Sequence, residues 1–319
     1  MTIKIKIIIS LFASLFIALC IGFGIGIYNE SKSVNFGSTN DPIPRKRLKE
    51  ECCKTINRVG LENINAYGSG IIYFQDFKNY FKDKLISPDQ PEKTNKNIYV
   101  INLLTDEMYY YKDRCLRWYG LGYTNKDLGQ HIFARKLFKS AYKSLLRLFY
   151  GTPPTDNPAL LQTERQIIEN LGGDYYIPFK GNDDWLGNQN YIDEVIHYFE
   201  SLPKGAKLYI HCAHGRGRTT TFLVMYDIFL NSNKVSLKDI SDRHFCLGRE
   251  NVLNTKLWAQ GTWTQEALDA RKDLIERFYA FMTDPHGYGH QSWTQWINSK
   301  DIEKKEITIH RTDKDKISK

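Results

Sequence analysis

Hydrophobic and polar residues alternate along the chain with two periods, one typical of strands and one typical of helices. Short apolar runs predict strands at 71–74, 98–104, 175–179 and 207–210. Apolar residues spaced three and four positions apart predict helices at 131–150, 160–171, 192–202 and 220–230. The strand–helix–strand–helix order of the second half is typical of an α/β fold built on a parallel sheet.

An uncharged run of about 21 residues, 7–27, stands apart from this pattern and follows Lys4 and Lys6. At about 1.5 Å per residue, a helix of this length spans the hydrocarbon core of a membrane. We therefore interpret 1–28 as a signal peptide or as a membrane anchor, and the sequence leaves both open. The basic start predicts that the remainder is exported from the cytoplasm, as a periplasmic or secreted protein or one anchored by residues 7–27.

The rest of the chain divides by composition into three parts. Residues 29–57 are polar and turn-rich, which predicts a linker. Residues 58–299 carry the strand and helix patterns and are expected to fold, with a small N-terminal subdomain within about 58–130. Residues 300–319 form a charged tail that we expect to be solvated.

The overall composition is that of an ordinary globular protein. Of 319 residues, 42% are hydrophobic and 25% are charged, which excludes a disordered or collagen-like chain. The mean hydropathy of −0.46 excludes a protein with many membrane spans. The net charge of +8 suits an anionic partner but serves solubility equally well. Nucleic-acid binding is not expected, because the basic residues are dispersed rather than interleaved with aromatic ones.

The six cysteines are too few for a disulfide scaffold in a chain of this length. Cys20 lies in the leader, and five further cysteines follow it: Cys52, Cys53, Cys115, Cys212 and Cys246. In an oxidising compartment, one or two disulfides are expected among Cys52, Cys53, Cys115 and Cys246. The odd number leaves one reactive cysteine free.

The clearest motif is the turn that follows the predicted strand 207–210. It reads His211-Cys212-Ala213-His214-Gly215-Arg216-Gly217-Arg218-Thr219, and a helix is predicted directly after it. A cysteine six positions before an arginine is weak evidence by itself, since Cys52 and Arg58 share this spacing without glycines or a preceding strand. Here two glycines stand inside the turn, at the carboxyl end of a strand, where α/β sheets bind their ligands.

These residue types suit a phosphate-binding turn that contains a nucleophile. Glycines at positive φ let successive backbone N–H groups point inward at an anion, and the following helix adds its positive N-terminal end. In such a cradle Cys212 is expected to be a thiolate. Arg218 supplies a planar fork for two phosphate oxygens. Thr219 offers a hydroxyl to the sulfur, and His211 is expected to fix the backbone of the turn.

The turn resembles the HCxxGxGRT signature of the cysteine-dependent phosphatases, the protein-tyrosine-phosphatase superfamily. Residues 202–212 and 235–240, and stretches near 60–70 and 102–120, are similar to the bacterial protein-tyrosine-phosphatase-like phytases. This resemblance covers most of the chain from about 58 to 285. It implies a phosphatase domain at 58–299 with a mostly parallel central sheet and helices on both faces.

The resemblance also implies a two-step hydrolysis of phosphate monoesters through a phosphocysteine on Cys212. An aspartate in the loop 180–189 would protonate the leaving oxygen and later activate water. Asp183 and Asp184 are the candidates, and counting back from Asp193 favours Asp183, which leaves Asp184 where the family usually has a histidine. The expected substrate contacts are Ala213, His214, Gly215, Arg216, Gly217, Lys180 and Asp184.

Three positions depart from the family pattern. The proline that is usual in the acid loop is missing, and Gly187 stands near its place. The family's Asp-Leu-Arg segment is here Asn102-Leu103-Leu104, so an arginine expected to help hold substrate or loop is absent. His244 stands where members tend to have glutamine. These changes bear on substrate preference and water positioning more than on the nucleophile.

The leading hypothesis is a phytase-type phosphatase acting on myo-inositol hexakisphosphate, an anionic small molecule. Arg249, Lys256 and a Lys-rich face of 131–150 are further candidates for a basic pocket. The alternatives are a protein-tyrosine or phosphoinositide phosphatase and a non-catalytic, membrane-tethered phosphate-binding module. The intact Cys212, Arg218 and loop aspartate argue against the module.

No metal or other cofactor is expected for this reaction. The phosphocysteine route needs none, and the sequence contains neither H-E-x-x-H nor paired C-x-x-C motifs. Membrane contact is expected only through the leader. The sequence leaves the oligomeric state open.

Overall fold

The computed structural model describes residues 37–71, 97–105, 108–111, 114–115, 161–179, 184–187, 189–257 and 263–300. The chain divides into two compact units. The first unit comprises Met1–Val34, Ile72–Tyr80 and Tyr109–Gln162, and the second comprises Asn35–Ile71, Phe81–Met108 and Thr163–Lys319.

The described residues of the first unit lie in or next to a small three-stranded sheet. Strand β4 (Tyr109–Tyr111) pairs with β5 (Arg114–Cys115), with Tyr110 opposite Cys115. Strand β6 (Gln162–Thr163) lies on the other side of β4.

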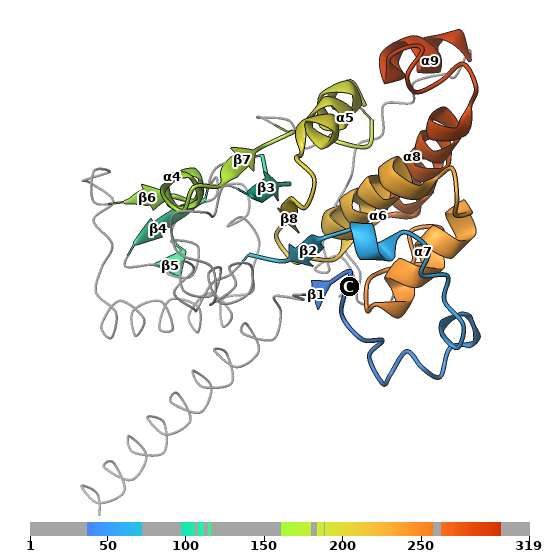
Figure 1. The fold of residues 1–319 in the computed structure, drawn as a ribbon, viewed down its shortest axis with the longest axis horizontal. Helices are drawn as coiled ribbons and strands as arrows, with labels where there is room; N and C mark the ends of the chain where they lie inside the picture. The colour runs from blue at the N-terminus through green and yellow to red at the C-terminus, as the bar shows by residue number, and fades with distance from the viewer. Residues whose placement is uncertain are drawn as a thin grey trace, which may run out of the picture. The chain divides into compact units, whose positions relative to one another are not determined.

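The second unit is built on a five-stranded sheet. Its strands follow the order β1 (Gly37–Ser38), β2 (Ala66–Ser69), β8 (Lys207–His211), β3 (Ile98–Asn102) and β7 (Asp174–Tyr176). All neighbouring strands run parallel except β1, which pairs antiparallel with β2 at one edge. β8 is therefore the central strand (Figure 1). Its last residue, His211, pairs with Ser69 and with Asn102, so three parallel strands reach the same edge together.

Helix α6 (Gly217–Asn231) follows the central strand and is almost wholly buried. It is covered on several sides, because β2, β8, α5 (Tyr191–Ser201), α7 (Leu237–Cys246) and α8 (Gln265–Thr283) all pack against it. Figure 1 shows α6 and α8 side by side. Helix α9 (Trp293–Ser299) packs on α5, and α4 (Glu164–Asn170) lies beside β7.

Two short 3₁₀ helices, η1 (Glu51–Cys53) and η2 (Leu61–Asn63), precede β3 in the chain. η1 packs against α7.

Hydroxyl side chains define the starts of four helices by accepting a hydrogen bond from the backbone three residues further on. These caps are Thr163 for α4, Ser236 for α7, Thr264 for α8 and Ser292 for α9. In α4 and α9 a glutamine side chain, Gln166 or Gln295, also accepts a hydrogen bond from the backbone N–H of the cap residue. The sequence thus fixes where these helices begin.

Aromatic side chains fill much of the core around α6 and α8. Phe179 meets Phe222 of α6 edge to face with the ring centroids 5.5 Å apart, and Phe281 of α8 meets Trp293 of α9 in the same way at 5.7 Å. Buried aromatic pairs of this kind contribute roughly 0.5–1.5 kcal/mol beyond the area that they bury.

The predicted α/β fold with a mostly parallel central sheet is confirmed. β3, β8, α5 and α6 correspond to predicted elements. α6 begins at Gly217 rather than at Thr220, because the end of the glycine-rich turn already forms its first turn. α4 begins at Glu164 rather than at residue 160, because Thr163 caps it and belongs to β6.

Other predicted elements differ from the structure or lie outside the described residues. β7 ends at Tyr176, before the end of the predicted strand 175–179. β2, α8 and α9 have no counterpart among the predicted elements. Of the predicted strand 71–74 only Ile71 is described, after the end of β2. The leader, the helix at 131–150 and the tail beyond residue 300 lie outside the described residues.

One disulfide joins two of the four cysteines that were expected to pair, Cys53 and Cys246. Cys52 and Cys212 are free thiols. Cys115 belongs to β5, and its side chain lies outside the described part of the structure.

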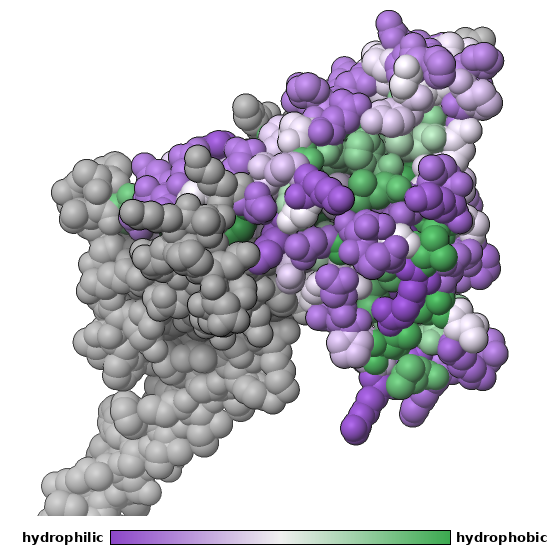
Figure 2. Space-filling view, viewed as in Figure 1, coloured by the Kyte–Doolittle hydropathy of each residue, from purple (hydrophilic) through white to green (hydrophobic). Residues whose placement is uncertain are grey.

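Hydrophilic residues dominate the described part of the face drawn in Figure 2, with hydrophobic residues in smaller patches between them. The large hydrophobic side chains that are most exposed are Leu48, Val59, Tyr109 and Leu257. Scattered exposure of this kind is normal for a protein surface. Within the described residues, none of the helices combines the length and the hydrophobicity that crossing a bilayer requires.

Candidate active site

The turn 211–219 joins the central strand to α6 and is held between the ends of β2 and β3. On one side, the N–H of Ile71 donates to the carbonyl of Ala213 at 3.3 Å. On the other side, the N–H of Leu103 donates to the carbonyl of His211 at 2.8 Å. These main-chain bonds fix the shape of the turn through its neighbours in the sheet.

Both glycines of the turn are required by close contacts. Gly215 has a φ of 68°, and a Cβ added to it would lie 2.3 Å from the backbone nitrogen of Gly70. A Cβ added to Gly217 would lie 2.4 Å from the ring of Trp263. Any larger residue at either position would therefore displace the backbone of the turn or the neighbouring residue, Gly70 or Trp263.

Cys212 lies in this turn and is buried. Burial by itself would raise the pKa of its thiol. The charge of Arg218, the hydroxyl and N–H of Thr219 and the N–H of His214 outweigh burial and lower the pKa below the ordinary thiol value. The surroundings of the sulfur thus favour the thiolate, as the sequence motif predicts.

Thr219 serves two acceptors with one hydroxyl. Its Oγ1 donates to the carbonyl of Ser69 at 3.2 Å, and the same hydroxyl interacts with the sulfur of Cys212. A hydroxyl carries a single proton, so these two bonds are alternatives. More negative charge on the sulfur favours the bond to Cys212.

Arg218 is half-buried in the first turn of α6. Its Nη1 donates to the carbonyl of Leu103 at 2.8 Å, which fixes the guanidinium beside the end of β3. The residue before the helix, Arg216, makes no side-chain cap bond, so the positive end of α6 points at the turn without a capping side chain. His214 and Arg216 are exposed on the outside of the turn.

Arg249, a sequence candidate for the basic pocket, is instead buried within the protein. Its guanidinium donates to the carbonyls of Gly37 at 2.6 Å, Gly68 at 2.9 Å and Gly215 at 3.4 Å. Burial lowers its pKa to about 10, which still leaves it protonated at neutral pH. Arg249 therefore ties the turn to β1 and β2 from inside the protein.

A buried polar network lies under the first residue of the turn. Tyr175 donates its hydroxyl to Glu164 Oε2 at 2.7 Å and accepts from Asn102 Nδ2 at 2.8 Å. His211 Nε2 lies 3.1 Å from the same Glu164 oxygen but is not aligned for a hydrogen bond. Asn102 Oδ1 accepts the N–H of Leu104 at 2.9 Å. The network joins the end of β8 to the segment that holds the arginine of the turn.

Glu164 is a residue of this site that sequence reasoning missed. The Thr163–Gln166 capping box marks the start of α4, but an acidic residue in a first helical turn is usually exposed. Nothing in the local pattern indicates that Glu164 is buried.

The acid loop is described only in part. Asp183 and Lys180 lie outside the described residues, so their roles stay predictions. Asp184 is described, and its Oδ1 accepts the N–H of Gly187 at 3.0 Å. A Cβ on Gly187 would come within 2.4 Å of the same carboxylate, which explains why glycine fits near the place of the missing proline. The Asp184 carboxylate thus stabilises the loop itself.

Trp185 anchors the acid loop next to the turn. Its side chain is buried, with its ring centroid 6.4 Å from that of Phe222 on α6 and 5.9 Å from that of Trp263. Trp263 in turn lies against Gly217. A continuous set of packed rings therefore connects the described part of this loop with the turn 211–219.

His244, the third departure from the family pattern, faces α6. Its Nε2 lies 2.9 Å from Asp227 Oδ2, and Arg243 bonds both oxygens of the same carboxylate. All three side chains are buried. Burial would raise the pKa of Asp227, but the bonds and charges of His244 and Arg243 lower it. The described contacts of His244 are those of a structural residue.

Part of the chain matches a family model, and two curated proteins are similar to it. The model of the protein-tyrosine-phosphatase-like phytases, described by the words "Inositol hexakisphosphate", matches residues 159–230, which include the whole turn. The uncharacterized protein AvrBs1.1 of Xanthomonas campestris pv. campestris is 31% identical over 94 residues, or 29% of this chain and 88% of that protein. The effector protein hopD2 of Pseudomonas syringae pv. tomato is 25% identical over 138 residues, or 43% of this chain and 29% of that protein.

Two solved structures share the fold. One is the tandemly repeated protein tyrosine phosphatase like phytase from Mitsuokella multacida, at 23% identity and a TM-score of 0.57. The other is the PTP-like myo-inositol phosphatase from the same organism in complex with myo-inositol-(1,3,4,5)-tetrakisphosphate, at 23% identity and a TM-score of 0.55. Each match covers 83% of this chain and 46% of the solved chain, so this chain spans less than half of their length.

The fold is the one that the solved protein-tyrosine-phosphatase-like phytases have. The chain belongs to one family with AvrBs1.1, and its segment 159–230 is similar to the protein-tyrosine-phosphatase-like phytases.

Proposed function

We propose that this protein hydrolyses phosphate monoesters of myo-inositol hexakisphosphate through a phosphocysteine on Cys212. The observation that carries the proposal is the charge balance at this sulfur. A buried cysteine in apolar packing has a raised pKa, whereas Arg218 and the polar groups of Thr219 and His214 lower that of Cys212. Such a thiolate is a nucleophile in a turn built to hold an anion.

In the first step, the Cys212 sulfur attacks phosphorus in line with the leaving oxygen. The S–P bond forms while the P–O bond to the inositol ring breaks. The N–H groups of the turn and the fork of Arg218 hold the remaining phosphate oxygens. Asp183, in the loop that Trp185 anchors, donates the proton that the leaving alkoxide requires.

In the second step, a water molecule attacks the phosphocysteine. Asp183 takes a proton from this water, inorganic phosphate is released, and Cys212 leaves as a thiolate. The Thr219 hydroxyl donates to the departing sulfur, which stabilises its returning negative charge. The enzyme is then ready for another phosphate group.

An inositol polyphosphate is the substrate class that the turn and the comparisons support best. His214 and Arg216 are exposed at the turn, where phosphates other than the reacting one would meet them. The family model names inositol hexakisphosphate, and one solved relative binds an inositol tetrakisphosphate. Phosphotyrosine and phosphoinositide lipids are the alternative substrates, because the same turn would hold their phosphate.

Phosphate release from three substrates ranks these possibilities. The purified protein is given myo-inositol hexakisphosphate, a phosphotyrosine peptide or phosphoinositide vesicles, with Cys212→Ser as the control. We expect the highest kcat/KM for the inositol phosphate and no turnover by Cys212→Ser, although it still binds. A higher kcat/KM for the peptide or lipid overturns the substrate assignment. No turnover of any substrate would leave the non-catalytic phosphate-binding module.

The two loop aspartates provide a matched pair of variants for the acid. Asp183→Asn is expected to lower kcat by about 10²–10⁴-fold, the usual contribution of a general acid. Asp184→Asn keeps an oxygen that accepts the Gly187 N–H and should lose less than about tenfold. The reverse order of effects would assign the acid to Asp184.

We further propose that the protein is exported. The uncharged run 7–27 after a basic start supports this, as does the similarity to a protein named as an effector. Cell fractionation of the tagged full chain tests the proposal, and retention in the cytoplasm would contradict it.

A further inference from the structure

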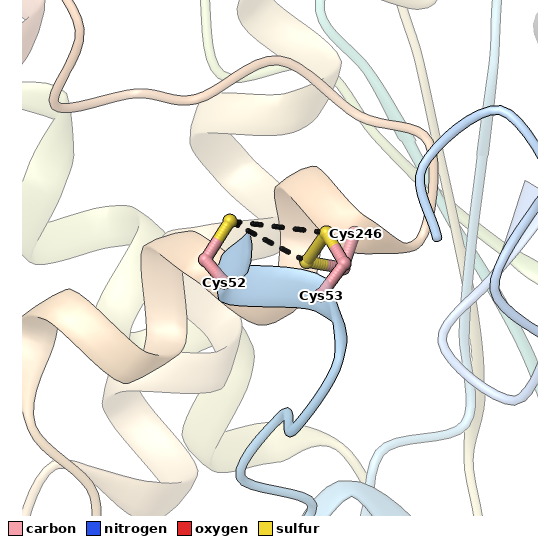
Figure 3. A group of neighbouring side chains, drawn as sticks. All are labelled: Cys52, Cys53 and Cys246. Carbon is pink, nitrogen blue, oxygen red and sulfur yellow. Dashed lines mark hydrogen bonds between the residues drawn. A yellow bond between two sulfur atoms is a disulfide. The ribbon is translucent and has the colours of Figure 1, made fainter. Parts of the chain in front are cut away.

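Three cysteines lie together where the N-terminal segment contacts α7 (Figure 3). Cys52 and Cys53 belong to η1, and Cys246 is the last residue of α7. Cys53 and Cys246 form the disulfide. The sulfur of Cys52 lies 3.8 Å from that of Cys53 and 4.0 Å from that of Cys246. A sulfur cluster is thus present outside the active site.

A structural disulfide explains two of these cysteines and leaves the third without a role. A thiol in contact with a disulfide exposes the bond to thiol–disulfide exchange, which is a disadvantage for a purely structural link. A role that accounts for the position of Cys52 therefore involves the other two sulfur atoms.

The distances from Cys52 match those of a metal–thiolate site. In a tetrahedral zinc site with Zn–S bonds of about 2.3 Å, two sulfur ligands lie about 3.8 Å apart. Cys52 is already at this separation from Cys53 and Cys246. Only the two bonded sulfur atoms must move apart, which happens when the disulfide is reduced.

Non-covalent contacts hold the chain on both sides of η1 against α7 independently of the disulfide. Arg243 on α7 donates from Nη1 to the carbonyl of Asn57 at 3.3 Å and to that of Val59 at 2.8 Å. The guanidinium of Arg47 lies 3.7 Å from the ring centroid of Phe245 on α7. Reduction therefore frees the sulfur atoms while their helices remain in contact.

Access and coordination number also suit a metal ion. Cys53 and Cys246 are buried, whereas Cys52 is partly exposed, so an ion reaches the cluster from the side of Cys52. Three protein sulfurs leave a fourth tetrahedral position for water.

We propose that Cys52, Cys53 and Cys246 bind a thiolate-preferring divalent metal, with Zn²⁺ as the first candidate, once the disulfide is reduced. A dithiol reductant supplies two electrons and two protons, so the disulfide becomes two thiols while the dithiol becomes a disulfide. Metal binding then forms three metal–sulfur bonds and releases the three thiol protons. The disulfide excludes the metal in an oxidising compartment, and the metal replaces the covalent link in a reducing one.

Co²⁺ is the probe for this site, because its thiolate complexes absorb light through sulfur-to-metal charge transfer. The full chain carries Cys212→Ser, so that the active-site thiol does not contribute. It is reduced without oxygen by a phosphine, which becomes a phosphine oxide with an oxygen atom from water. We expect one equivalent of Co²⁺ to bind the reduced protein and to be displaced by Zn²⁺. The same protein in its oxidised form should bind none.

Cys52→Ser in the same background is the matched control. Losing a ligand should weaken Co²⁺ binding at least as much as the roughly 10–100-fold cost of losing an outer-shell partner. Unchanged stoichiometry and affinity in Cys52→Ser would overturn the proposal, as would metal binding by the oxidised protein.

Thermal unfolding of the reduced protein keeps the test independent of the cobalt spectrum. Zn²⁺ that binds only the folded chain must raise the Tm as its concentration rises. A reduced protein that is folded by circular dichroism but shows no such shift contradicts the proposal. None of the three sulfur atoms belongs to the turn 211–219, so this result does not depend on the proposed phosphatase activity.

Discussion

Gly215 shows how closely single residues define the turn 211–219. Its φ of 68° suits glycine, and the backbone of Gly70 leaves no room for a side chain. On the inner side of the turn, Arg249 and Glu164 are charged and buried, each with polar partners. Both kinds of constraint, steric and electrostatic, keep the sulfur and the arginine of the turn in place.

Gly215→Ala should therefore damage the site more than the fold as a whole. Gly205→Ala is the matched control, because Gly205 has a φ of 81° and no atom near an added Cβ. The control should cost only the roughly 1–2 kcal/mol of a left-handed alanine. Gly215→Ala should cost more and lower kcat by about 10²-fold or more, because the turn must move. Equal effects of the two variants on denaturant unfolding and turnover would show that the contact with Gly70 does not matter.

Glu164→Gln tests the buried network under His211. The amide keeps the shape of the carboxylate but removes its charge and places an N–H₂ group among existing donors. We expect a loss of about 1–3 kcal/mol in the free energy of unfolding and about tenfold in kcat/KM. Glu169→Gln on the exposed side of the same helix should change neither. If both variants match the parent, the network has no role in positioning the turn.

The sequence predicts only those residues of the candidate site whose role depends on residues close to them in the chain. Cys212 and Arg218 were found because the strand, turn and helix that place them are contiguous. Glu164 was missed, and Arg249 was predicted in a different role, because their partners lie on other strands, such as Gly68 for Arg249. Burial of a charged side chain depends on these remote contacts, and local patterns do not contain them.

Helices α6 and α7 are joined by a buried ion pair. Arg243 and His244 of α7 bind Asp227 of α6, and this arrangement fixes the helix that carries the turn at its start. Arg243 also binds the carbonyl of Val59, so the N-terminal segment is part of the same assembly. Removing Asp227 would leave the buried side chains of Arg243 and His244 without the negative charge that they bind.

Asp227→Asn should lower the free energy of unfolding at neutral pH by about 3–5 kcal/mol. Asp273→Asn, which breaks a partly exposed pair with Arg277 on α8, should cost less than about 1 kcal/mol. The lowered pKa of Asp227 means that its contribution is complete above its ordinary pKa of about 3.9 and is lost as the pH falls further. The difference between wild type and Asp227→Asn should thus narrow in acid. A difference in the free energy of unfolding that stays constant from neutral pH into acid would show that the charge of Asp227 is not its cause.

At the scale of elements, the periodicity of apolar residues predicted those helices and strands whose burial is visible in their own sequence. The helix α5 shows its apolar stripe, and β3 and β8 read as apolar runs because both lie inside the sheet. β2 was not recognised, since its sequence Ala-Tyr-Gly-Ser has small residues where Thr219, Leu223 and Arg249 come close to Gly68. This strand depends on its partners more than on its own propensity.

On the scale of the whole molecule, the segment that contains β1 and η1 is attached to the five-stranded sheet and to α7. β1 extends the sheet, Arg249 binds Gly37, and the disulfide Cys53–Cys246 closes a loop of 193 residues. A link between such distant parts of the chain restricts the unfolded state more than the folded one. No local pattern reveals its pairing, and the sequence accordingly left the choice among four cysteines open.

Reduction of this disulfide should lower the free energy of unfolding by about 2–5 kcal/mol. The comparison uses Cys212→Ser, with and without a phosphine reductant and with a chelator present to exclude metal binding. Cys53→Ser in the same background should reproduce the loss without the reductant. Denaturant curves that coincide for oxidised and reduced protein would show that the link contributes no stability.

The central claim is that Cys212 is ionised in its turn, and alkylation by iodoacetamide as a function of pH measures this directly. Mass spectrometry follows the peptides of Cys212 and Cys52 separately, and burial raises the pKa of Cys52, which makes it an internal reference. We predict that Cys212 reacts with a midpoint well below about 8.5, the pKa of a free thiol, that phosphate protects it, and that Cys52 reacts only at higher pH. A Cys212 midpoint at or above that of a free thiol would contradict the account.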